Sequence, residues 1–421
     1  MEYTNKKTKY IVYGLIIIII FLVIGGVYYL FTLNNAKGQI KEFERSVQEN
    51  DYKKIAEQLS SNEQTLSKID AKNFVIFVKK KENQKQYNEQ IQNIKNNIDK
   101  GKKYKIDYGS ITDQNGKELI TVKKNGKKLF LIDKLEFKPK LTSVYVKEFN
   151  NTGYYQYKQK SDKEIIAESN QSTELGKFFI GQYNIQVNKT IKDSLHNGNA
   201  TGKINIDLNN RENGKKIYAD EDFNQSWFKA KLINDDLLEK SNSQIVIEDK
   251  EVDYTSNKVY GKYYNPTTLK VYATGKLEGK EFKTNIINLR RNYKNDYQNL
   301  KLSFDKNQIE DYKQDSNEIK DKAKDYIKKY IKALNKAYDK QDYKHVSEFI
   351  KSNSQLEKQL KKNIKDKEKV KFREVKINNV ERDNNKITIN LNKQIDNNVT
   401  TSRYVLNYNK LDKDFKIEKA E

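Results

Sequence analysis

The sequence predicts a multi-domain α+β protein that follows a single N-terminal transmembrane helix. Three observations lead to this fold class. Residues 11–33 form an apolar run without a charge, apolar residues then recur at steps of three and four up to about residue 99, and a period of two begins beyond Gly101. A chain of 421 residues is also too long for one ordinary core. We therefore expect several folded modules behind the membrane segment.

The run from residue 11 to residue 33 is long enough to span a bilayer, because a helix needs about 20 apolar residues to cross the hydrocarbon layer. A cleaved signal peptide has a shorter apolar region and a small-residue cleavage site, so we expect a retained signal anchor. The flanking lysines give only a weak orientation signal. A short tail, residues 1–10, before a long body favours a cytoplasmic N-terminus and an extracellular body. The alternative is a cytoplasmic body.

The composition excludes several kinds of chemistry. The chain has no cysteine, which excludes disulfides, thiolate metal sites and cysteine nucleophiles. Only His196 and His345 are present, so a two-histidine metal site or a nucleophile–His triad is nearly excluded. We expect no cofactor, no metal and no enzyme activity. The 81 Lys and Arg against 58 Asp and Glu give a formal charge of +23, which favours polyanionic neighbours, although AT-rich codons also supply lysine.

The residues after the membrane segment divide into three modules by their periodicity. Residues 34–100 are expected to form a small helical module, with a helix start at Asp51. Residues 101–212 and 213–312 are expected to form two small all-β modules. In the first of these, Asn125-Gly126 predicts a type I′ turn between strands 119–124 and 127–132. The other expected strands are 142–146, 153–157, 183–187, 204–208, 244–247, 269–274 and 281–287.

The last module, residues 313–421, opens with a helix over about 318–338. Its apolar residues fall within an arc of roughly 140°, which is wide enough to pack on a sheet. A second helix is expected to start at Asp342 and a third to cover 355–364. Antiparallel strands follow at 371–380, 386–394, 402–408 and 415–418. Helices laid over a curved sheet in this order predict an NTF2-like α+β cone.

Several stretches resemble the TcaA-like, teicoplanin-resistance-associated membrane proteins of Gram-positive bacteria. They are residues 43–51, the Asn125-Gly126 hairpin running into 129–134, residues 175–183 and the C-terminal pattern over 326–350. The resemblance implies a single-pass protein with repeated small extracytoplasmic domains, linked to the cell envelope and to the response to glycopeptide antibiotics. Many members also carry a zinc ribbon with paired CxxC motifs before the membrane helix, and this chain departs from the family there.

The candidate binding site is a lysine stripe on the expected helix 318–338. Lysines recur there at every fourth residue, opposite the apolar arc: Lys320, Lys324, Lys328, Lys332 and Lys336. A charge run is usually a solvated face. The functional alternative is that the stripe binds teichoic-acid phosphates or anionic headgroups, where each nearby Lys contributes on the order of 1 kcal/mol.

Other candidate residues have simpler explanations. His345 has no carboxylate or second histidine at a telling spacing, and His196 is expected in a loop. Trp227-Phe228 offers rings for sugar stacking, although a lone Trp in a β module is more often core. Residues 275–280 have the wrong glycine spacing for a phosphate loop. The acidic runs 220–222 and 235–236 are expected to be solvated turns, because neither has the pattern of a calcium loop.

The leading hypothesis is a non-enzymatic cell-envelope protein. Its extracytoplasmic modules would bind wall polymers such as teichoic acids or peptidoglycan, or wall-assembly proteins, and so modulate susceptibility to wall-directed antibiotics. One alternative is a ligand-sensing or enzymatic role for the C-terminal cone, and another is a structural spacer. Nucleic acid is not expected as a partner, because no nucleic-acid motif is present.

Overall fold

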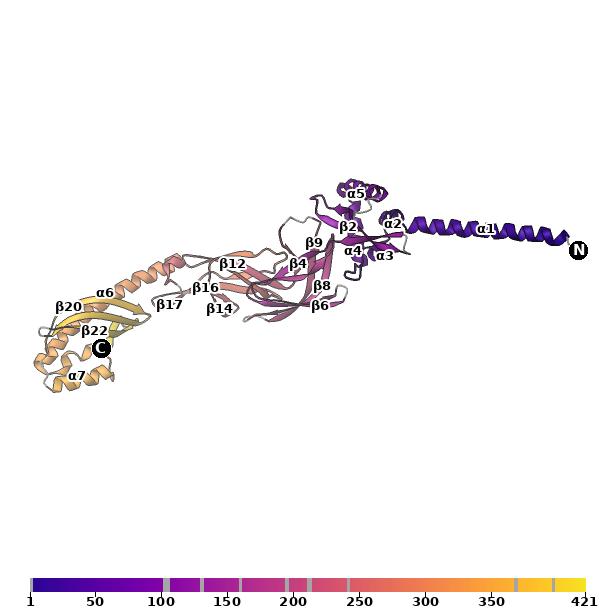
Figure 1. Ribbon diagram of the computed structural model, residues 1–421. Coiled ribbons are helices and arrows are strands. Elements are labelled where there is room, and N and C mark those ends of the chain that lie inside the picture. The colour runs from indigo at the N-terminus through magenta and orange to yellow at the C-terminus, as the bar shows by residue number, and fades with distance from the viewer. Residues whose placement is uncertain are drawn as a thin grey trace. The chain divides into compact units, whose positions relative to one another are not determined.

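The computed structural model describes residues 3–100, 107–128, 132–158, 161–193, 197–209, 214–240, 243–366, 370–395 and 398–421 (Figure 1). The chain forms two compact units. The first consists of Met1–Trp227, Tyr260–Pro266 and Arg291–Asp296, and the second of Phe228–Val259, Thr267–Arg290 and Tyr297–Glu421.

The first unit begins with α1, Tyr3–Asn34, which contains the apolar run. The segment Thr8–Thr32 is long and apolar enough to cross a membrane, and its side chains are not buried against the rest of the protein. An apolar helix that buries nothing within its own fold needs a lipid environment to cover it. The predicted N-terminal apolar helix is confirmed.

A helical region follows, with elements α2 Ala36–Glu49, α3 Tyr52–Gln58, α4 Lys68–Lys79 and α5 Lys81–Asp99. The expected helix start at Asp51 is confirmed, because its carboxylate accepts a hydrogen bond from the Lys54 N–H at 3.1 Å. The apolar residues at three- and four-residue steps are buried, as Ile40 and Phe43 show. Phe43 stacks on Phe137 with 4.5 Å between ring centroids, so the helices share a core with the sheet that follows.

That sheet has three antiparallel strands in the order β1-β2-β3: β1 Asp107–Thr112, β2 Glu118–Lys128 and β3 Ile132–Pro139. The prediction of a turn at Asn125-Gly126 was wrong. Lys124 lies opposite Leu135 and Lys127 opposite Asp133, so β2 has one residue more than β3 between these pairs. Gly126 has φ +74°, which a β-bulge accepts as readily as a turn does. The residues 129–131 lie outside the described part of the chain.

The rest of the first unit is built mainly from two sheets. The three-stranded sheet has the order β10-β4-β7, with β10 Ile217–Tyr218, β4 Thr142–Lys147 and β7 Ser172–Phe178. The five-stranded sheet has the order β11-β9-β8-β5-β6, with β11 Asp220–Asp222, β9 Gly198–Asp207, β8 Gln182–Lys192, β5 Thr152–Lys158 and β6 Asp162–Ala167 (Figure 1). Residues from both sheets belong to one buried core, for example Val144 and Ile204.

The β part of the second unit contains a four-strand path, β14-β13-β16-β17, with β18 also paired to β16. These strands are β13 Gln244–Ile247, β14 Lys250–Asp253, β16 Leu269–Leu277, β17 Lys280–Lys283 and β18 Ile287–Leu289. Residues 228–233 of β12 Gln225–Ile233 pair in parallel with β19 Gln298–Ser303. The 3₁₀ turn η1 Asp235–Leu237 also belongs to this region, whereas residues 260–264 of β15 Val259–Tyr264 belong to the first unit. The β16–β17 connection is a two-residue turn, in which Glu278 and Gly279 have φ +49° and +82°.

The C-terminal part opens with α6, Lys306–Lys340, which begins earlier than the expected start at residue 318. Asp305 caps it by accepting hydrogen bonds from the N–H groups of Asn307 at 3.0 Å and Gln308 at 3.2 Å. The expected second helix was wrong in type. Asp342 caps a 3₁₀ turn instead, η2 Tyr343–His345, which precedes η3 Ser347–Phe349. The third helix is confirmed as α7 Gln355–Lys365.

A four-stranded antiparallel sheet completes this part, in the order β20-β21-β22-β23: β20 Phe372–Asp383, β21 Lys386–Ile395, β22 Asn398–Asn409 and β23 Asp414–Ala420. Figure 1 shows the later turns of α6 lying along this sheet. The apolar arc of α6 is buried, with Ile327, Tyr330 and Leu334 all in one core with the strands. The predicted α+β order, helices first and an antiparallel sheet after them, is confirmed.

Candidate functional site

The five-stranded sheet of the first unit has one buried face and one exposed polar face. Burial alternates along the inner strands, as β8 shows: Val187, Lys189 and Ile191 are buried, whereas Gln186 and Asn188 are exposed. A period of two places alternate side chains on opposite faces of a sheet. The exposed face therefore carries amides and hydroxyls on several neighbouring strands.

The strand register aligns eight side chains of this face in two rows, which we call the outer-face rows. The first row runs across β6, β5, β8 and β9 as Glu164, Gln156, Asn188 and Thr201. The second row runs across the same strands as Ile166, Tyr154, Thr190 and Asn199. Neighbouring strands lie about 4.8 Å apart, so each row presents a line of side chains about 15 Å long.

Hydrogen bonds between neighbouring strands hold four of these side chains in place. The Thr201 hydroxyl donates to Asn188 Oδ1 at 2.9 Å, and the Thr190 hydroxyl donates to Asn199 Oδ1 at 2.8 Å. An Asn side chain has two donor hydrogens and two acceptor positions, so each of these bonds uses only part of its capacity. These four side chains are therefore fixed in position and retain donors and acceptors that face solvent.

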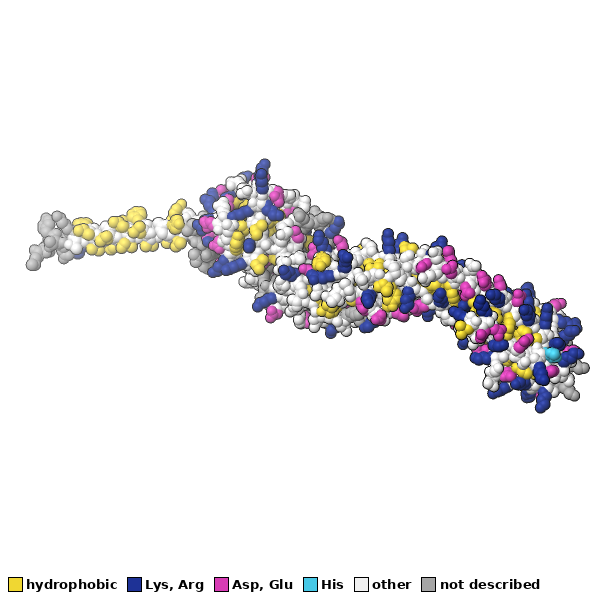
Figure 2. Space-filling view, turned by 180° about the vertical axis from the view of Figure 1, so that it is seen from behind, with side chains coloured by type: hydrophobic (Ala, Val, Ile, Leu, Met, Phe, Trp, Pro, Cys, Tyr) yellow, Lys and Arg dark blue, Asp and Glu magenta, His cyan; other side chains and the backbone are white. Residues whose placement is uncertain are grey.

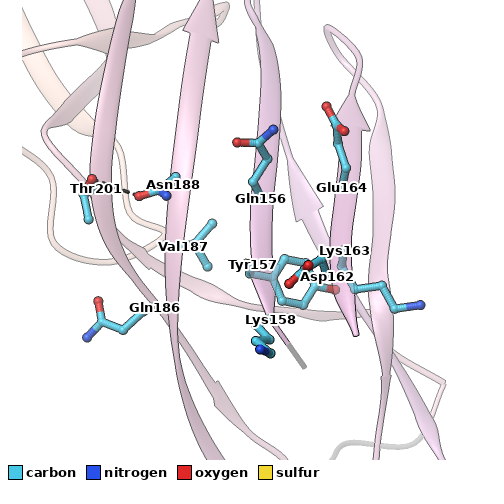
Figure 3. A pocket seen from close by; sticks show the side chains of 10 residues that line it. All are labelled: Gln156, Tyr157, Lys158, Asp162, Lys163, Glu164, Gln186, Val187, Asn188 and Thr201. Atoms are coloured by element: carbon cyan, nitrogen blue, oxygen red, sulfur yellow. Dashed lines mark hydrogen bonds between the residues drawn. The ribbon is translucent and has the colours of Figure 1, made fainter. Parts of the chain in front are cut away.

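A hollow of about 540 Å³ includes the whole first row in its lining, together with Tyr157 and Val187 from the buried face. Figure 3 shows Gln156, Glu164 and Asn188 on neighbouring strands around it. The full lining is Gln156, Tyr157, Lys158, Asp162, Lys163, Glu164, Gln186, Val187, Asn188 and Thr201. Two lysines are balanced by two carboxylates, so the lining has no net formal charge. Such a surface suits a neutral polar ligand better than a polyanion.

The second row adds apolar surface to this polar face. Ile166 is 48% exposed, although it is large and apolar. The half-buried Tyr154 lies opposite it in the register, and the Lys192 ammonium lies 4.6 Å from the centre of the tyrosine ring. An aromatic ring beside amide and hydroxyl groups offers a surface for stacking together with partners for hydrogen bonds. This combination suits a ligand with both C–H faces and hydroxyl groups.

The buried face of the same sheet contains a cluster of ionised side chains. The fully buried Lys189 donates from Nζ to Glu148 Oε1 at 2.7 Å and to Glu221 Oε2 at 2.9 Å. Its third contact is Gln225 Oε1 at 2.8 Å, and Lys262 Nζ lies 2.5 Å from Glu221 Oε1. Burial raises the pKa of the Glu221 carboxyl. The positive charges of Lys189 and Lys262 lower this pKa by a larger amount, so the net shift is downward. Glu221 is therefore ionised at neutral pH.

This cluster corrects the prediction that residues 220–222 form a solvated acidic turn. Glu221 is 1% exposed. The sequence did contain a signal for this buried cluster, because Lys189 lies between Val187 and Ile191 at an inward position of an alternating strand. A lysine at such a position needs a buried counter-charge. The cluster links four chain segments and supports the sheet that carries the outer-face rows.

The five predicted lysines of α6 do not form one uniform row. Lys320 is ion-paired with Glu278 on the β16–β17 turn and is half-buried. It therefore does not present the exposed ammonium that the predicted anion-binding stripe requires. Lys324 pairs with Asp321 at 2.8 Å and Lys328 with Asp325 at 3.7 Å.

The two other members of the stripe are Lys332 and Lys336. Both are exposed, and no described carboxylate forms an ion pair with either of them. Figure 2 shows Lys and Arg side chains interspersed with Asp and Glu on the surface. The positive charge is therefore spread among carboxylates rather than concentrated.

The other candidate residues stay outside the site. Trp227 and Phe228 are both fully buried, so neither ring is available for stacking. His345 is half-buried in η2, and His196 lies outside the described residues. Within the described ranges, no three His, Asp or Glu side chains are placed to hold a metal ion. The segment 275–280 is the end of β16 and its turn into β17, not a phosphate loop.

The fold defines a class of protein: a single-pass membrane protein with a helical region, β sheets and an NTF2-like C-terminal domain. Comparison with known proteins gives the particular family. Residues 319–421 match the TcaA protein NTF2-like domain, and residues 36–139 match the TcaA protein second domain. The chain is a TcaA-like membrane protein, as the resemblance in its sequence indicated.

Curated relatives agree with this assignment. The membrane-associated protein TcaA of Staphylococcus aureus (strain Mu3 / ATCC 700698) is 28% identical over 308 residues, which are 73% of this chain and 65% of the relative. The protein of the same name from strain MW2 is 27% identical over the same extent. The match thus covers slightly less than two thirds of the relatives' own length. No solved structure matches the chain.

Proposed function

We propose that this chain is a non-enzymatic envelope protein that binds wall polymer through the outer-face rows, and that it thereby modulates the response to glycopeptide antibiotics. In this proposal the N-terminus is cytoplasmic and the body lies outside the membrane. Its membrane association and its likeness to TcaA support a place in the cell envelope. The observation that carries the proposal is the alignment of fixed amides and hydroxyls beside Tyr154 and Ile166.

The chemistry of this face favours the glycan part of the wall. A sugar chain presents hydroxyls and amides that donate and accept at once, and side chains such as Asn188 and Thr201 do the same. Sugar rings also present C–H faces, which pack on a ring such as that of Tyr154. The balanced charge of the hollow gives no reason for phosphate to bind there. The proposed ligand is therefore the uncharged glycan backbone of the wall.

The first test removes three side chains of the first row together. The triple variant Gln156→Ala, Asn188→Ala, Thr201→Ala is expected to bind teichoic-acid-free sacculi at least tenfold more weakly, because each lost hydrogen bond contributes about 0.5–1.5 kcal/mol. Binding is measured by co-sedimentation of the full chain in nanodiscs. Exposed or partly exposed polar side chains contribute little to folding, so the variant should melt at the same temperature as the unmodified chain.

The chain offers a matched control for this variant. In the C-terminal sheet, the Thr401 hydroxyl donates to Asn392 Oδ1 at 3.1 Å, which is the same kind of pair as Thr201 with Asn188. The variant Asn392→Ala, Thr400→Ala, Thr401→Ala should bind sacculi as the unmodified chain does. Equal losses in the two triple variants would reject the outer-face rows as the site.

The lysines of α6 support a second, smaller contribution from anionic polymer. The observation in its favour is the exposure of Lys328, Lys332 and Lys336 on one helix. Changing these three to Gln is expected to weaken binding only to sacculi that retain teichoic acid, by a fewfold, and added salt should abolish the difference. A loss of the same size on teichoic-acid-free sacculi would contradict a phosphate contact.

A further inference from the structure

The inner face of the C-terminal sheet ends in a lysine. Along β21 the inward side chains Ile387, Ile389 and Leu391 are fully buried, and the next inward position is Lys393. Lys393 is only half-buried, so it lies where the apolar core opens toward solvent. A core-facing position of this kind usually carries an apolar residue.

Aromatic side chains from both neighbouring strands surround this ammonium. Lys393 Nζ donates to the Tyr404 hydroxyl oxygen at 2.8 Å and lies 5.3 Å from the centre of the same ring. The Phe372 ring centre lies 4.3 Å from Nζ, which is a close cation–π distance. Asn335 of α6 holds the Phe372 backbone with two hydrogen bonds of 2.9 Å each. The Lys393 ammonium therefore lies between the rings of Phe372 and Tyr404, and α6 holds the Phe372 backbone in position.

Within the described ranges, the ammonium has no counter-charge. Among the described residues, no carboxylate lies within ion-pair distance of Lys393 Nζ. The neighbouring titratable groups are Tyr404 and, beyond it on α6, Tyr330 and Tyr338. Burial raises the pKa of both Tyr404 and Tyr330, so these two are uncharged at neutral pH. Burial without an offsetting anion lowers the pKa of Lys393 to about 8.

We infer that Lys393 anchors a binding site for a small organic anion, a monocarboxylate with an apolar body. An ammonium has three donor hydrogens, and Tyr404 takes one of them, which leaves two for carboxylate oxygens. The rings of Phe372 and Tyr404 provide apolar surface for the rest of the ligand. A single cation among rings does not match a phosphate polymer, which needs several cations. This inference concerns the C-terminal domain and does not depend on the proposed glycan binding.

Benzoate is the probe for this site, and the full chain in nanodiscs is the sample. Acetylation of individual lysines is followed by mass spectrometry at pH 7.4. Benzoate at ten times its dissociation constant should slow acetylation of Lys393 about tenfold, because a bound carboxylate covers the amine. Lys386 is exposed on the same strand and serves as the internal control, whose rate should not change. Equal acetylation of Lys393 with and without benzoate would overturn the inference.

Variants and pH give independent readouts of the same site by calorimetry. Lys393→Gln should abolish benzoate binding, and Lys386→Gln should retain it. The affinity of the unmodified chain should fall roughly tenfold from pH 7 to pH 9, because the ammonium loses its proton through a pKa near 8. Affinity that does not change over this range, or binding by Lys393→Gln as tight as that of the unmodified chain, would contradict the role of Lys393. If Lys393→Gln fails to fold, the acetylation experiment on the unmodified chain still tests whether benzoate binds at Lys393.

Discussion

Replacing Lys189 by Met is expected to lower the free energy of unfolding of the first unit by about 3–5 kcal/mol. The ammonium of Lys189 is fully buried between Glu148 and Glu221, and all three side chains are at most 1% exposed. Removing it leaves Glu148 without a positive partner and Glu221 with Lys262 alone. Breaking a buried ion pair from one side has a larger effect than replacing the whole pair, because the remaining charge stays buried.

Urea unfolding measured by hydrogen exchange on β8 and β9 peptides reports this effect directly. Lys192→Met is the matched control, because Lys192 lies on the same strand but is exposed. It should change stability by no more than about 0.5 kcal/mol. The outer-face rows, which are the proposed glycan site, are carried by the same strands, so Lys189→Met should also weaken sacculus binding. If Lys189→Met unfolds at the same urea concentration as the unmodified chain, the cluster does not stabilise the sheet.

Replacing Tyr330 by Ala is expected to lower the stability of the C-terminal domain by about 3–5 kcal/mol. Tyr330 is 1% exposed, and its ring contacts Phe349 and Tyr404 with centroid distances of 6.0 and 5.8 Å. Its loss would leave a cavity between α6 and the sheet, where these rings meet. Surrounding side chains relax only partly into such a cavity, so the lost contacts are not replaced.

Hydrogen exchange on peptides from residues 372–421 in increasing urea measures this change. Lys329→Ala removes the side chain next to Tyr330 on the exposed face of α6, and it should leave the exchange rates unchanged. Peptides from β8 should not respond to Tyr330→Ala, because they belong to the other unit. Unchanged protection of β22 in Tyr330→Ala would show that α6 does not stabilise this sheet through Tyr330.

Local patterns predicted most of the elements, and the errors occurred where distant residues decide the structure. The step of three and four from Ile40 and the alternation along β8 are visible in the sequence, and both are confirmed. The signal of Asn125-Gly126 is satisfied by a bulge as well as by a turn, and only the pairing of β2 with β3 decides between them. The start of α6 was missed because residues 306–317 are mostly polar, with Ile309 and Tyr312 as isolated buried positions.

The candidate site was harder to predict than the fold. Polar residues of β5, β8 and β9 look like any solvated strand face until the register places Gln156, Asn188 and Thr201 side by side. The lysine stripe was visible because its period is local to one helix. The ion pair of Lys320 with Glu278 was not, since it joins residues 42 positions apart. Properties that depend on one segment are readable from the sequence, whereas those that depend on pairing are not.

Photo-crosslinking in intact Gram-positive cells tests the central claim most directly. A benzophenone side chain is placed at position 156 in the outer-face rows or at position 400 in the C-terminal sheet of the full chain. After irradiation, sacculi are boiled in detergent, digested and assayed for attached protein. The account predicts several-fold more protein attached from position 156 than from position 400. Equal attachment from both positions, or none from either, would contradict an extracellular body that binds wall glycan through this face.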